Sequence, residues 1–255
     1  MLDEADRLIG PDQASDYPLL RTLRALANSG RCQFVFCGEH SLHDELANPK
    51  SPLYNFANEM LIGRLDFHSV RELIIQPMSD LEIKLIDEEQ IVDRIWKFTS
   101  GHPNVVQRLC QHLVTKLYEE RQFDLRIEDV EGVIQDADFL RKDFLDTYWD
   151  RASTLERLCS LIIAKDESIC TLAAVHTALT QHGLQATLNQ VHDALERLVD
   201  LRNILRRTPD GYGFAVTAFP EVISKTSRVD DLIALACEEY RQTSTFETYT
   251  KRGAQ

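Results

Sequence analysis

MLDEAD, at residues 1–6, is the segment from which we infer the fold of this 255-residue chain. Two apolar residues stand directly before acidic ones, which is the pattern of a buried strand that ends at the polar edge of a sheet. A parallel strand covered on both faces is apolar throughout, and about four or more apolar residues are expected before its polar end. Because only Met1 and Leu2 precede the acids, we expect the sequence to begin inside a strand.

Further elements of an α/β fold follow this segment. Leucines recur at helical spacing over Tyr17–Asn28 and predict a helix. The mostly apolar residues 32–38, which end in glycine, indicate another parallel strand, and residues 60–65 a last short one. Ligands of open α/β sheets bind at the carboxyl ends of such strands. We therefore predict the second half of an α/β core at residues 1–68, in a chain of class α/β plus α.

The composition is ordinary for a soluble protein, at 44% hydrophobic and 27% charged residues. No apolar run approaches the roughly 18 residues that a membrane span needs, and no signal-peptide pattern is present. We therefore expect a cytoplasmic protein without membrane contact. The six cysteines form no C-x-x-C pair, so neither a zinc site nor a disulfide framework is indicated. A net charge of −13 disfavours broad binding to nucleic-acid phosphates.

Residues 69–150 carry only helical patterns. One apolar helix face precedes Pro77, which we expect to stop that helix. Asp87 is placed to cap a second helix. The junction SGHP at residues 100–103 then ends one helix and starts the next, because glycine terminates helices and proline fits their first turn. With a fourth helical region at about 128–150, these residues predict a small helical lid.

Residues 151–226 have their own helix and turn signals. Ser153 and Thr187 each begin a capping box, and a further helix lies between them. The turn TPDG at residues 208–211 separates two short segments that indicate a β-hairpin. Three helices followed by a hairpin predict a winged helix. Residues 227–255 are expected to form a C-terminal helix and a polar tail that frays.

The combination resembles the STAND class of AAA+-related P-loop ATPases, from Asp3 to about Lys225. The most diagnostic element is SGHPNVVQ at residues 100–107, since this class often carries glycine-glycine-histidine-proline followed by apolar residues and glutamine. Serine replaces the first glycine here. The resemblance implies that MLDEAD is a Walker B segment, that Pro103 lies against the adenine of ATP, and that the backbone near Gly101 borders the same pocket.

The cofactors expected from this resemblance are ATP and Mg²⁺. A magnesium ion that bridges the β- and γ-phosphates needs a hard oxygen ligand, usually through water, and Asp3 is our candidate. Glu4 is our candidate to orient or deprotonate the attacking water, which would make it the catalytic residue. A polar residue after the second strand should sense the γ-phosphate, but Glu39, His40 and Ser41 are unusual choices and this role stays unassigned.

The phosphate-binding loop G-x-x-x-x-G-K-[ST] does not occur in the sequence. We therefore expect these residues alone neither to bind ATP tightly nor to hydrolyse it, and interpret the sequence as truncated. Met1 would be an internal methionine read as a start, or a split gene would supply the loop on another chain. We favour the first origin, because a break inside a strand leaves a sheet edge unpaired.

Each motif also has a simpler interpretation. MLDEAD alone fits a solvated helix N-terminus and resembles motif II of DEAD-box RNA helicases, whose serine-alanine-threonine element and second RecA-like domain are not found here. The Gly101–Pro103 junction alone is a common helix connection. His40 and His43 have the spacing of metal ligands but lack a nearby third one. Arg64 is either an arginine finger acting on a neighbour or an ordinary surface arginine.

Three functions of different class follow. In the first, ATP or ADP couples core and lid to the winged helix as a molecular switch, which acts on a protein effector or through self-association. In the second, the winged helix is a DNA-binding regulator. In the third, it is a protein-interaction or autoinhibitory module without ATPase activity.

The charges of the predicted winged helix help to decide whether it binds DNA or protein. Residues 153–216 hold six Lys and Arg against seven Asp and Glu. The predicted third helix, which would enter a DNA groove, carries three acids and one arginine: Asp193, Glu196, Asp200 and Arg197. Base-reading helices seldom carry such an excess of acids, so DNA is not favoured. Three arginines near the hairpin could still touch phosphates: Arg202, Arg206 and Arg207.

Overall fold

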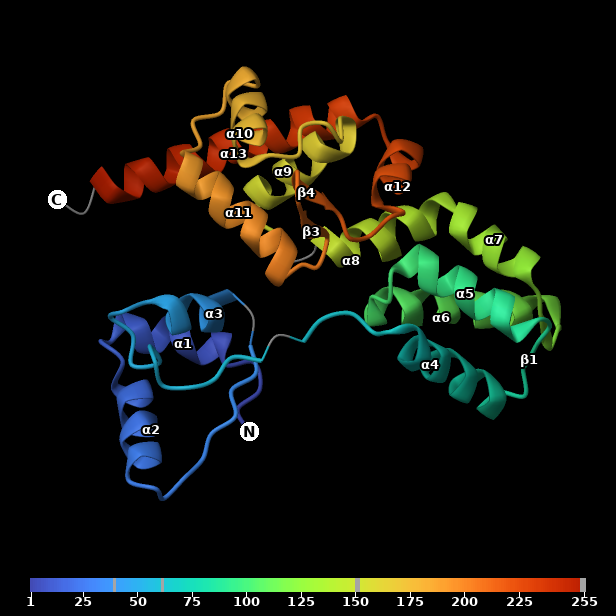
Figure 1. Cartoon of the computed structure of the whole chain (residues 1–255), viewed down its shortest axis with the longest axis horizontal. Coiled ribbons are helices and arrows are strands. Elements are labelled where there is room, and N and C mark those ends of the chain that lie inside the picture. Colours follow the sequence, from blue (N-terminus) through green and yellow to red (C-terminus); the bar gives the residue numbers. More distant parts are fainter. Residues whose placement is uncertain (39, 61, 150–151, 253–255) are drawn as a thin grey trace. The chain divides into compact units, whose positions relative to one another are not determined.

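The computed structural model describes residues 1–38, 40–60, 62–149 and 152–252, except for the side chains of His40, Thr226 and residues 244–252. The chain forms two compact units, Met1–Ile62 and Gly63–Gln255, each of which is described on its own (Figure 1). About 63% of the chain is helical, and each sheet has two strands. Helices therefore dominate both units.

The first unit contains helices α1 (Asp6–Ala14), α2 (Pro18–Asn28) and α3 (His40–Ala47). Leu2 and Phe36 form an isolated parallel bridge, in which Leu2 N–H donates to Val35 O and Cys37 N–H donates to Leu2 O, both at 2.8 Å. Residues 32–38 otherwise form no strand, and neither do residue 60 and residues 62–65, so the strands expected there are wrong. A parallel strand is held by bonds to its neighbours, and among the described residues of this unit the Leu2–Phe36 bridge is the one strand pairing that forms.

Two aspartates of the first unit begin its helices. Asp12, which is buried, accepts the N–H groups of Leu19 and Leu20 at 2.7 and 2.9 Å and thereby starts α2. Asp6 accepts Ser41 N–H at 2.8 Å at the start of α3. These three bonds satisfy first-turn donors that lack a partner inside the helix. The helices then bury a small core made of Ala5, Ile9, Tyr17, Leu20, Leu42 and Leu53.

The second unit begins with helices α4 (Phe67–Asp80), α5 (Glu88–Thr99), α6 (Pro103–Glu120) and α7 (Ile127–Gln135). Short strands β1 (Lys84–Leu85) and β2 (Asp124–Leu125) pair in parallel between them. Pro77 lies inside α4 instead of stopping it. Proline removes one helical hydrogen bond, but the last turn is held because Met78 is buried in the core and Leu81 N–H donates to Pro77 O.

The predicted fourth helix of the lid is divided into three segments. After α7, a π-helical segment η1 (Phe139–Leu145) leads into the short α8 (Asp146–Trp149). The helix is interrupted at Asp136, whose carboxylate accepts Phe139 N–H at 2.8 Å and so starts the next helical segment. The new direction brings Phe144 and Tyr148 against Phe219, which lies far along the chain.

The last part of the chain contains α9 (Thr154–Lys165), α10 (Leu172–Gln181) and α11 (Leu188–Asp200), then strands β3 (Leu205–Thr208) and β4 (Gly211–Phe214). The capping boxes at Ser153 and Thr187 form as predicted. The strands pair antiparallel, with Leu205 opposite Phe214 and Thr208 opposite Gly211, which confirms the hairpin.

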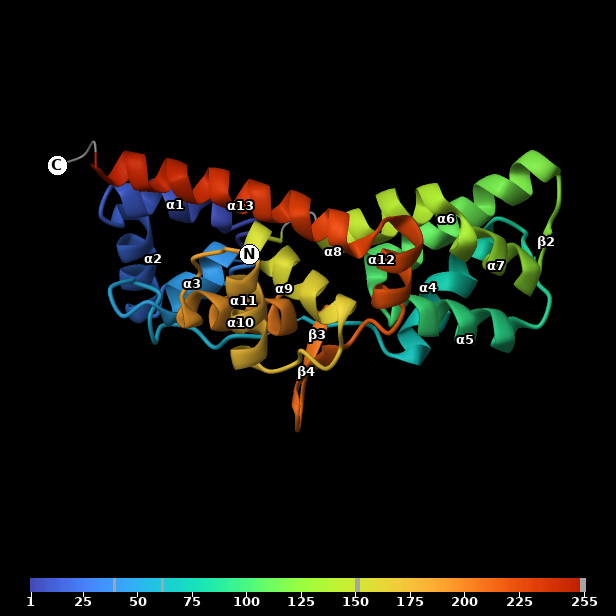
Figure 2. The same ribbon diagram turned by 90° about the horizontal axis from the view of Figure 1, so that it is seen from above.

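Two C-terminal helices complete the second unit: α12 (Phe219–Thr226) and α13 (Val229–Arg252). Helix α13 packs along α9 (Figure 2). Helix α13 extends to Arg252, and within it Thr243 Oγ1 donates to Glu239 O at 3.0 Å. The fraying expected of the tail stays a prediction. One continuous apolar core joins α4–α7, η1, α9–α11, the hairpin and α12.

Candidate functional site

The acidic pair Asp3 and Glu4 follows directly on the parallel bridge of Leu2. Both side chains are exposed to solvent. Asp3 Oδ1 accepts Glu4 N–H at 2.9 Å, and Glu4 has a left-handed backbone with φ of +49°. Glu4 pairs with Arg7 at 2.6 Å, with 57% of its side chain exposed. The two carboxylates are accessible to solvent and stand at the carboxyl end of a parallel contact.

Asp6, the last acid of MLDEAD, has a different role. Its carboxylate accepts the N–H groups of Ser41 and Leu42 and lies against Gly38, where an added Cβ would come within 2.4 Å of Asp6 Oδ2. Gly38 is therefore needed for close approach, in addition to ending the apolar segment. This cap was missed from the sequence, because it joins residues that are 35 positions apart.

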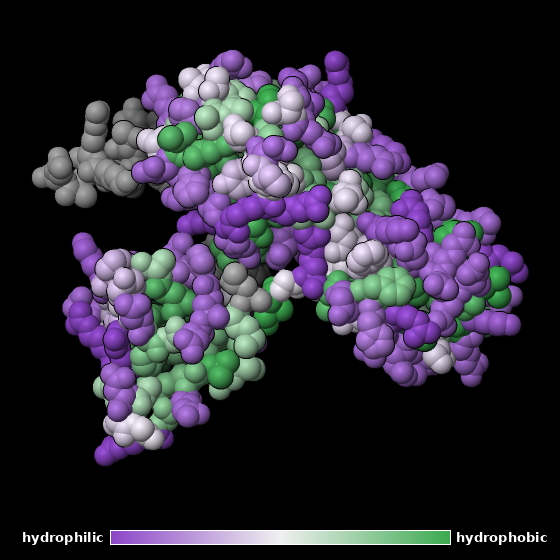
Figure 3. All heavy atoms as spheres, viewed as in Figure 1, coloured by the Kyte–Doolittle hydropathy of each residue, from purple (hydrophilic) through white to green (hydrophobic). Residues whose placement is uncertain are grey.

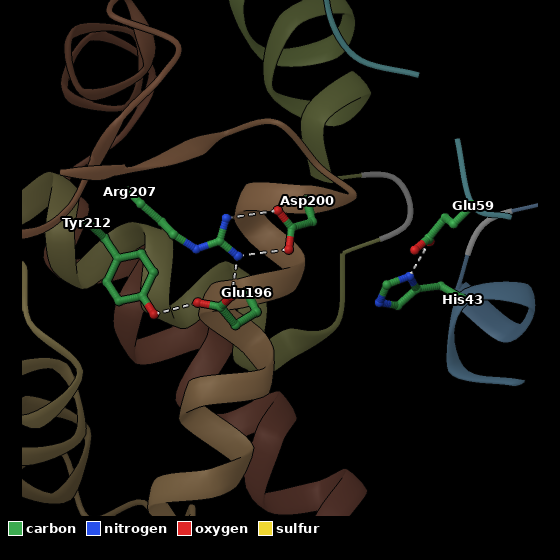
Figure 4. A network of polar contacts seen from close by, with 6 residues as sticks. All are labelled: His43, Glu59, Glu196, Asp200, Arg207 and Tyr212. Atoms are coloured by element: carbon green, nitrogen blue, oxygen red, sulfur yellow. Dashed lines mark hydrogen bonds and ion pairs between the residues drawn. The ribbon is translucent and has the colours of Figure 1, made fainter. Parts of the chain in front are cut away.

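Residues considered for γ-phosphate sensing or metal binding follow the same segment. Glu39 and the side chain of His40 lie outside the described residues, and Ser41 uses its N–H to bind Asp6. His43 Nδ1 lies 2.7 Å from Glu59 Oε1 (Figure 4). No group of three metal-ligating side chains occurs among the residues that the structure describes. The carboxylates of Asp3 and Glu4 fit water-mediated contact to Mg²⁺ but do not form a complete site.

In the second unit, the junction at residues 100–103 is tightly packed. Gly101 has φ of +74°, and an added Cβ would lie 2.1 Å from Leu65 O. Leu65 N–H donates to Gly101 O at 2.8 Å, so the segment before α4 is bonded to this junction. Pro103 occupies the first turn of α6 and is exposed. Gly101 therefore has a packing role, whereas Pro103 is open to a ligand.

His102 faces the interior of this junction. Its ring lies edge-on to that of Tyr148, with centroids 4.7 Å apart, and its buried Nδ1 atom has no hydrogen-bond partner. Burial, with Arg64 as a second cause, lowers the pKa of His102 to about 4. The histidine is therefore neutral near pH 7 and serves the packing of the junction.

Arg64 joins the junction to the segment after the hairpin. Its guanidinium donates to Ala215 O at 2.7 Å and to Ser100 O at 3.4 Å. The arginine is half-buried, and burial lowers its pKa. These contacts make Arg64 a structural link between distant parts of the chain, since both acceptors are backbone carbonyls.

The hairpin is bound to α11 by a polar network (Figure 4). Arg207 of β3 donates to Asp200 at 2.9 and 3.2 Å and to Glu196. Tyr212 of β4 donates to Glu196 at 2.7 Å. Hydrogen bonds to Asp200 and Glu196 raise the pKa of Arg207, and burial raises that of Tyr212 to about 12. An arginine of the hairpin is thus held by acids of its own domain.

Comparisons of the chain with protein-family models, with curated proteins and with solved structures found no match. Each helix in the described part of the chain is too short or too polar to cross a lipid bilayer.

Proposed function

We propose that this chain is the C-terminal portion of an ATP-dependent molecular switch, in which nucleotide couples a partial P-loop core and a helical lid to a winged helix. The observation that carries the proposal is the parallel bridge between Leu2 and Phe36. It sets the exposed carboxylates of Asp3 and Glu4 at the carboxyl end of a parallel contact, where open α/β sheets bind ligands.

Asp3 would hold water on Mg²⁺, and Glu4 would orient the attacking water. Glu4 must first leave Arg7, which is a small cost because exposed ion pairs contribute about 0–1 kcal/mol. Bound Mg–ATP would supply the phosphoryl group and the charge that neutralises it. Segments that hold the phosphates are absent from this sequence, so the proposed site needs a phosphate loop from further sequence or a second chain.

Pro103 would supply the adenine contact. It is exposed at the start of α6, and Gly101 fixes the preceding backbone through its bond to Leu65. A proline ring at a fixed helix start gives a rigid apolar surface for a flat base. We place this switch in the cytoplasm.

For the C-terminal domain we propose contact with protein, either an effector or a second copy of the chain. Of the three arginines suggested for DNA phosphates, Arg202 is buried in an ion pair with Glu156 and Arg207 is held by Asp200 and Glu196. Releasing it would leave acids facing a phosphate backbone, which opposes DNA binding. A duplex-binding assay at 50 and 200 mM salt distinguishes the two, because phosphate contacts should make DNA affinity fall steeply with salt.

The nucleotide proposal is tested first by reading the source genome upstream of the codon for Met1. We expect an in-frame apolar strand preceded by a G-x-x-x-x-G-K-[ST] loop, or a separate chain that carries them. The natural protein should then be labelled by 8-azido-ATP in the peptide that contains Pro103, and unlabelled ATP should compete. Absence of such labelling in a protein with an intact phosphate loop would contradict the proposal.

A further inference from the structure

A pocket of about 160 Å³ lies in the second unit, where α5 meets α12 and η1. A buried water needs about 10–15 Å³ of such space, so this pocket has room for a group as large as a phosphate. Leu140 and Val222 give it apolar walls, and Arg94, Lys97 and Lys225 contribute charge. The pocket contains none of the residues assigned to the nucleotide.

The lining of the pocket is cationic, although the whole chain has a net charge of −13. Three of its side chains are positive and one, Glu221, is negative. A cleft with an excess of positive side chains attracts anions, and here each of the three positive side chains is also paired with a carboxylate, Glu131, Asp93 or Glu221.

Arg94 is held ready for a ligand. Glu131 accepts two hydrogen bonds from its guanidinium, and the guanidinium lies over the ring of Phe98 at 5.9 Å from the centroid. A guanidinium fixed on one edge by a carboxylate and on one face by an aromatic ring keeps its orientation. Such a planar fork matches two oxygens of a phosphate group.

The two lysines are more exposed than Arg94, whose side chain is 35% exposed. Lys97 pairs with Asp93 at 2.7 Å and is 63% exposed, and Lys225 pairs with Glu221 at 2.7 Å and is 46% exposed. Exposed pairs of this kind contribute little to stability. Both ammonium groups can therefore turn to an anion without a large loss.

The start of α12 adds to this environment. Thr217 and Ala218 line the pocket, and Ala218, at the N-cap position, has no side chain that could accept a first-turn N–H group. The N-terminus of a helix carries partial positive charge. Phe219 N–H donates to Val216 O and Pro220 has no N–H group, so the helix start contributes its dipole to the pocket but few of its N–H donors.

We infer that this pocket binds a phosphate group, either inorganic or carried by a small organic molecule. Arg94 and Lys97 of α5 would bind it from one side and Lys225 of α12 from the other. The ligand would thus connect the helices of residues 69–150 with the segment that follows the hairpin. This inference uses residues of the second unit only, and stands whether or not the first unit takes part in nucleotide binding.

Calorimetric titration of the 255-residue chain with pyrophosphate, inorganic phosphate and phenyl phosphate, at constant ionic strength set with NaCl, tests this inference. We expect saturable binding of at least one of them. Preference for phenyl phosphate would indicate an organic monoester, and preference for the other two an inorganic source. Absence of saturable binding by all three would overturn the inference.

Variants locate the site. The double variant K97Q/K225Q should weaken binding at least tenfold, and E221Q should strengthen it severalfold by removing the one carboxylate. The matched control K84Q/K165Q removes two exposed lysines of the same unit that do not line the pocket, and D3N changes the proposed magnesium ligand; both should leave affinity unchanged. Equal weakening by the two lysine pairs would show unspecific attraction and overturn the proposal. Thermal unfolding of each variant shows whether it is folded.

Discussion

The two units differ in how they cover their apolar residues. Among the described residues, seven large hydrophobic side chains are exposed in the first unit and five in the second, although the second is about three times longer. In the face seen in Figure 3, hydrophobic surface is likewise more prominent on the first unit. The exposed residues of the first unit include Val35, Met60 and Ile62, which lie in the segments predicted as strands.

This difference shows what each kind of element needs. A helix satisfies its backbone within one segment, and its apolar face needs only a neighbouring helix. A central parallel strand needs partners on both edges and cover on both faces. The helices of the second unit have neighbouring helices for their apolar faces throughout. Among the described residues, the first unit provides the pairing that a parallel strand needs at one residue pair, Leu2 and Phe36.

Within the second unit, breaking the buried ion pair is expected to cause the largest loss of stability. Arg202 and Glu156 lie 3.2 Å apart with side chains 7% and 1% exposed. Arg202→Met leaves a buried carboxylate without this partner and should lower the free energy of unfolding by about 3–5 kcal/mol in urea denaturation. Arg71→Met, which removes the partner of exposed Glu88, should cost less than about 1 kcal/mol. Similar losses would contradict a burial-dependent effect.

Substitution at the helix junction should come next. Gly101→Ala puts a Cβ against Leu65 O at a positive φ and should cost about 2–4 kcal/mol by chemical denaturation. Gly132→Ala is the matched control, because Gly132 lies inside α7 with φ in the ordinary range and space for a methyl group. It should gain up to about 1 kcal/mol. A neutral Gly101→Ala would show that the junction is not tightly packed.

The pH dependence of the second unit should reflect His102. Because its pKa of about 4 in the folded protein lies below the ordinary histidine pKa of 6.5, the unfolded chain binds the proton first as pH falls. The contribution of neutral His102 to the free energy of unfolding is complete above pH 6.5 and is lost between pH 6.5 and 4. Unfolding free energy should fall by about 2 kcal/mol from pH 7.5 to 5 on this account.

Two variants isolate that effect. His102→Phe keeps an aromatic ring beside Tyr148 and should remove this part of the pH dependence. His68→Gln changes an exposed histidine of the same unit and should leave it intact. An unchanged slope in His102→Phe would mean that the unfolding transition is linked to other groups.

The smallest expected effect on stability distinguishes Asp6 from Asp3 in the first unit. Asp6→Ala removes a carboxylate that accepts two backbone N–H groups at the start of α3 and should cost about 1 kcal/mol in thermal or urea unfolding. Asp3→Ala should change stability by less than about 0.5 kcal/mol, because Asp3 is exposed. Equal losses would imply that Asp3 also serves structure.

Local signals made most of the helices predictable. The caps at Asp87, Ser153 and Thr187 all accept the N–H groups expected of them. The hairpin was predictable from its turn residues, because glycine and aspartate favour the backbone conformation of a tight turn. The Gly101 junction was identified as a helix boundary, but its close contact with Leu65 is a tertiary feature that no local pattern indicates.

Features that depend on distant residues were missed. The strands expected at residues 32–38 and 60–65 have apolar sequences, but pairing decides whether such segments become strands. The π-helical segment η1 was also not predicted. It accompanies the packing of Phe144 against Phe219, which lies far along the chain. The network of Arg207 was foreseen only as an excess of acids on α11 and not as a set of bonds.

The central claim is most directly tested by single-turnover ATP hydrolysis with the natural protein that includes a phosphate loop, on its own chain or on a partner. Glu4→Gln should slow hydrolysis at least about a hundredfold while ATP binding persists, because the proposal gives this residue the task of orienting the attacking water. Asp16→Asn, which changes another exposed, ion-paired acid of the same unit, should hydrolyse ATP normally. Wild-type hydrolysis by Glu4→Gln would contradict the role given to the acids of MLDEAD.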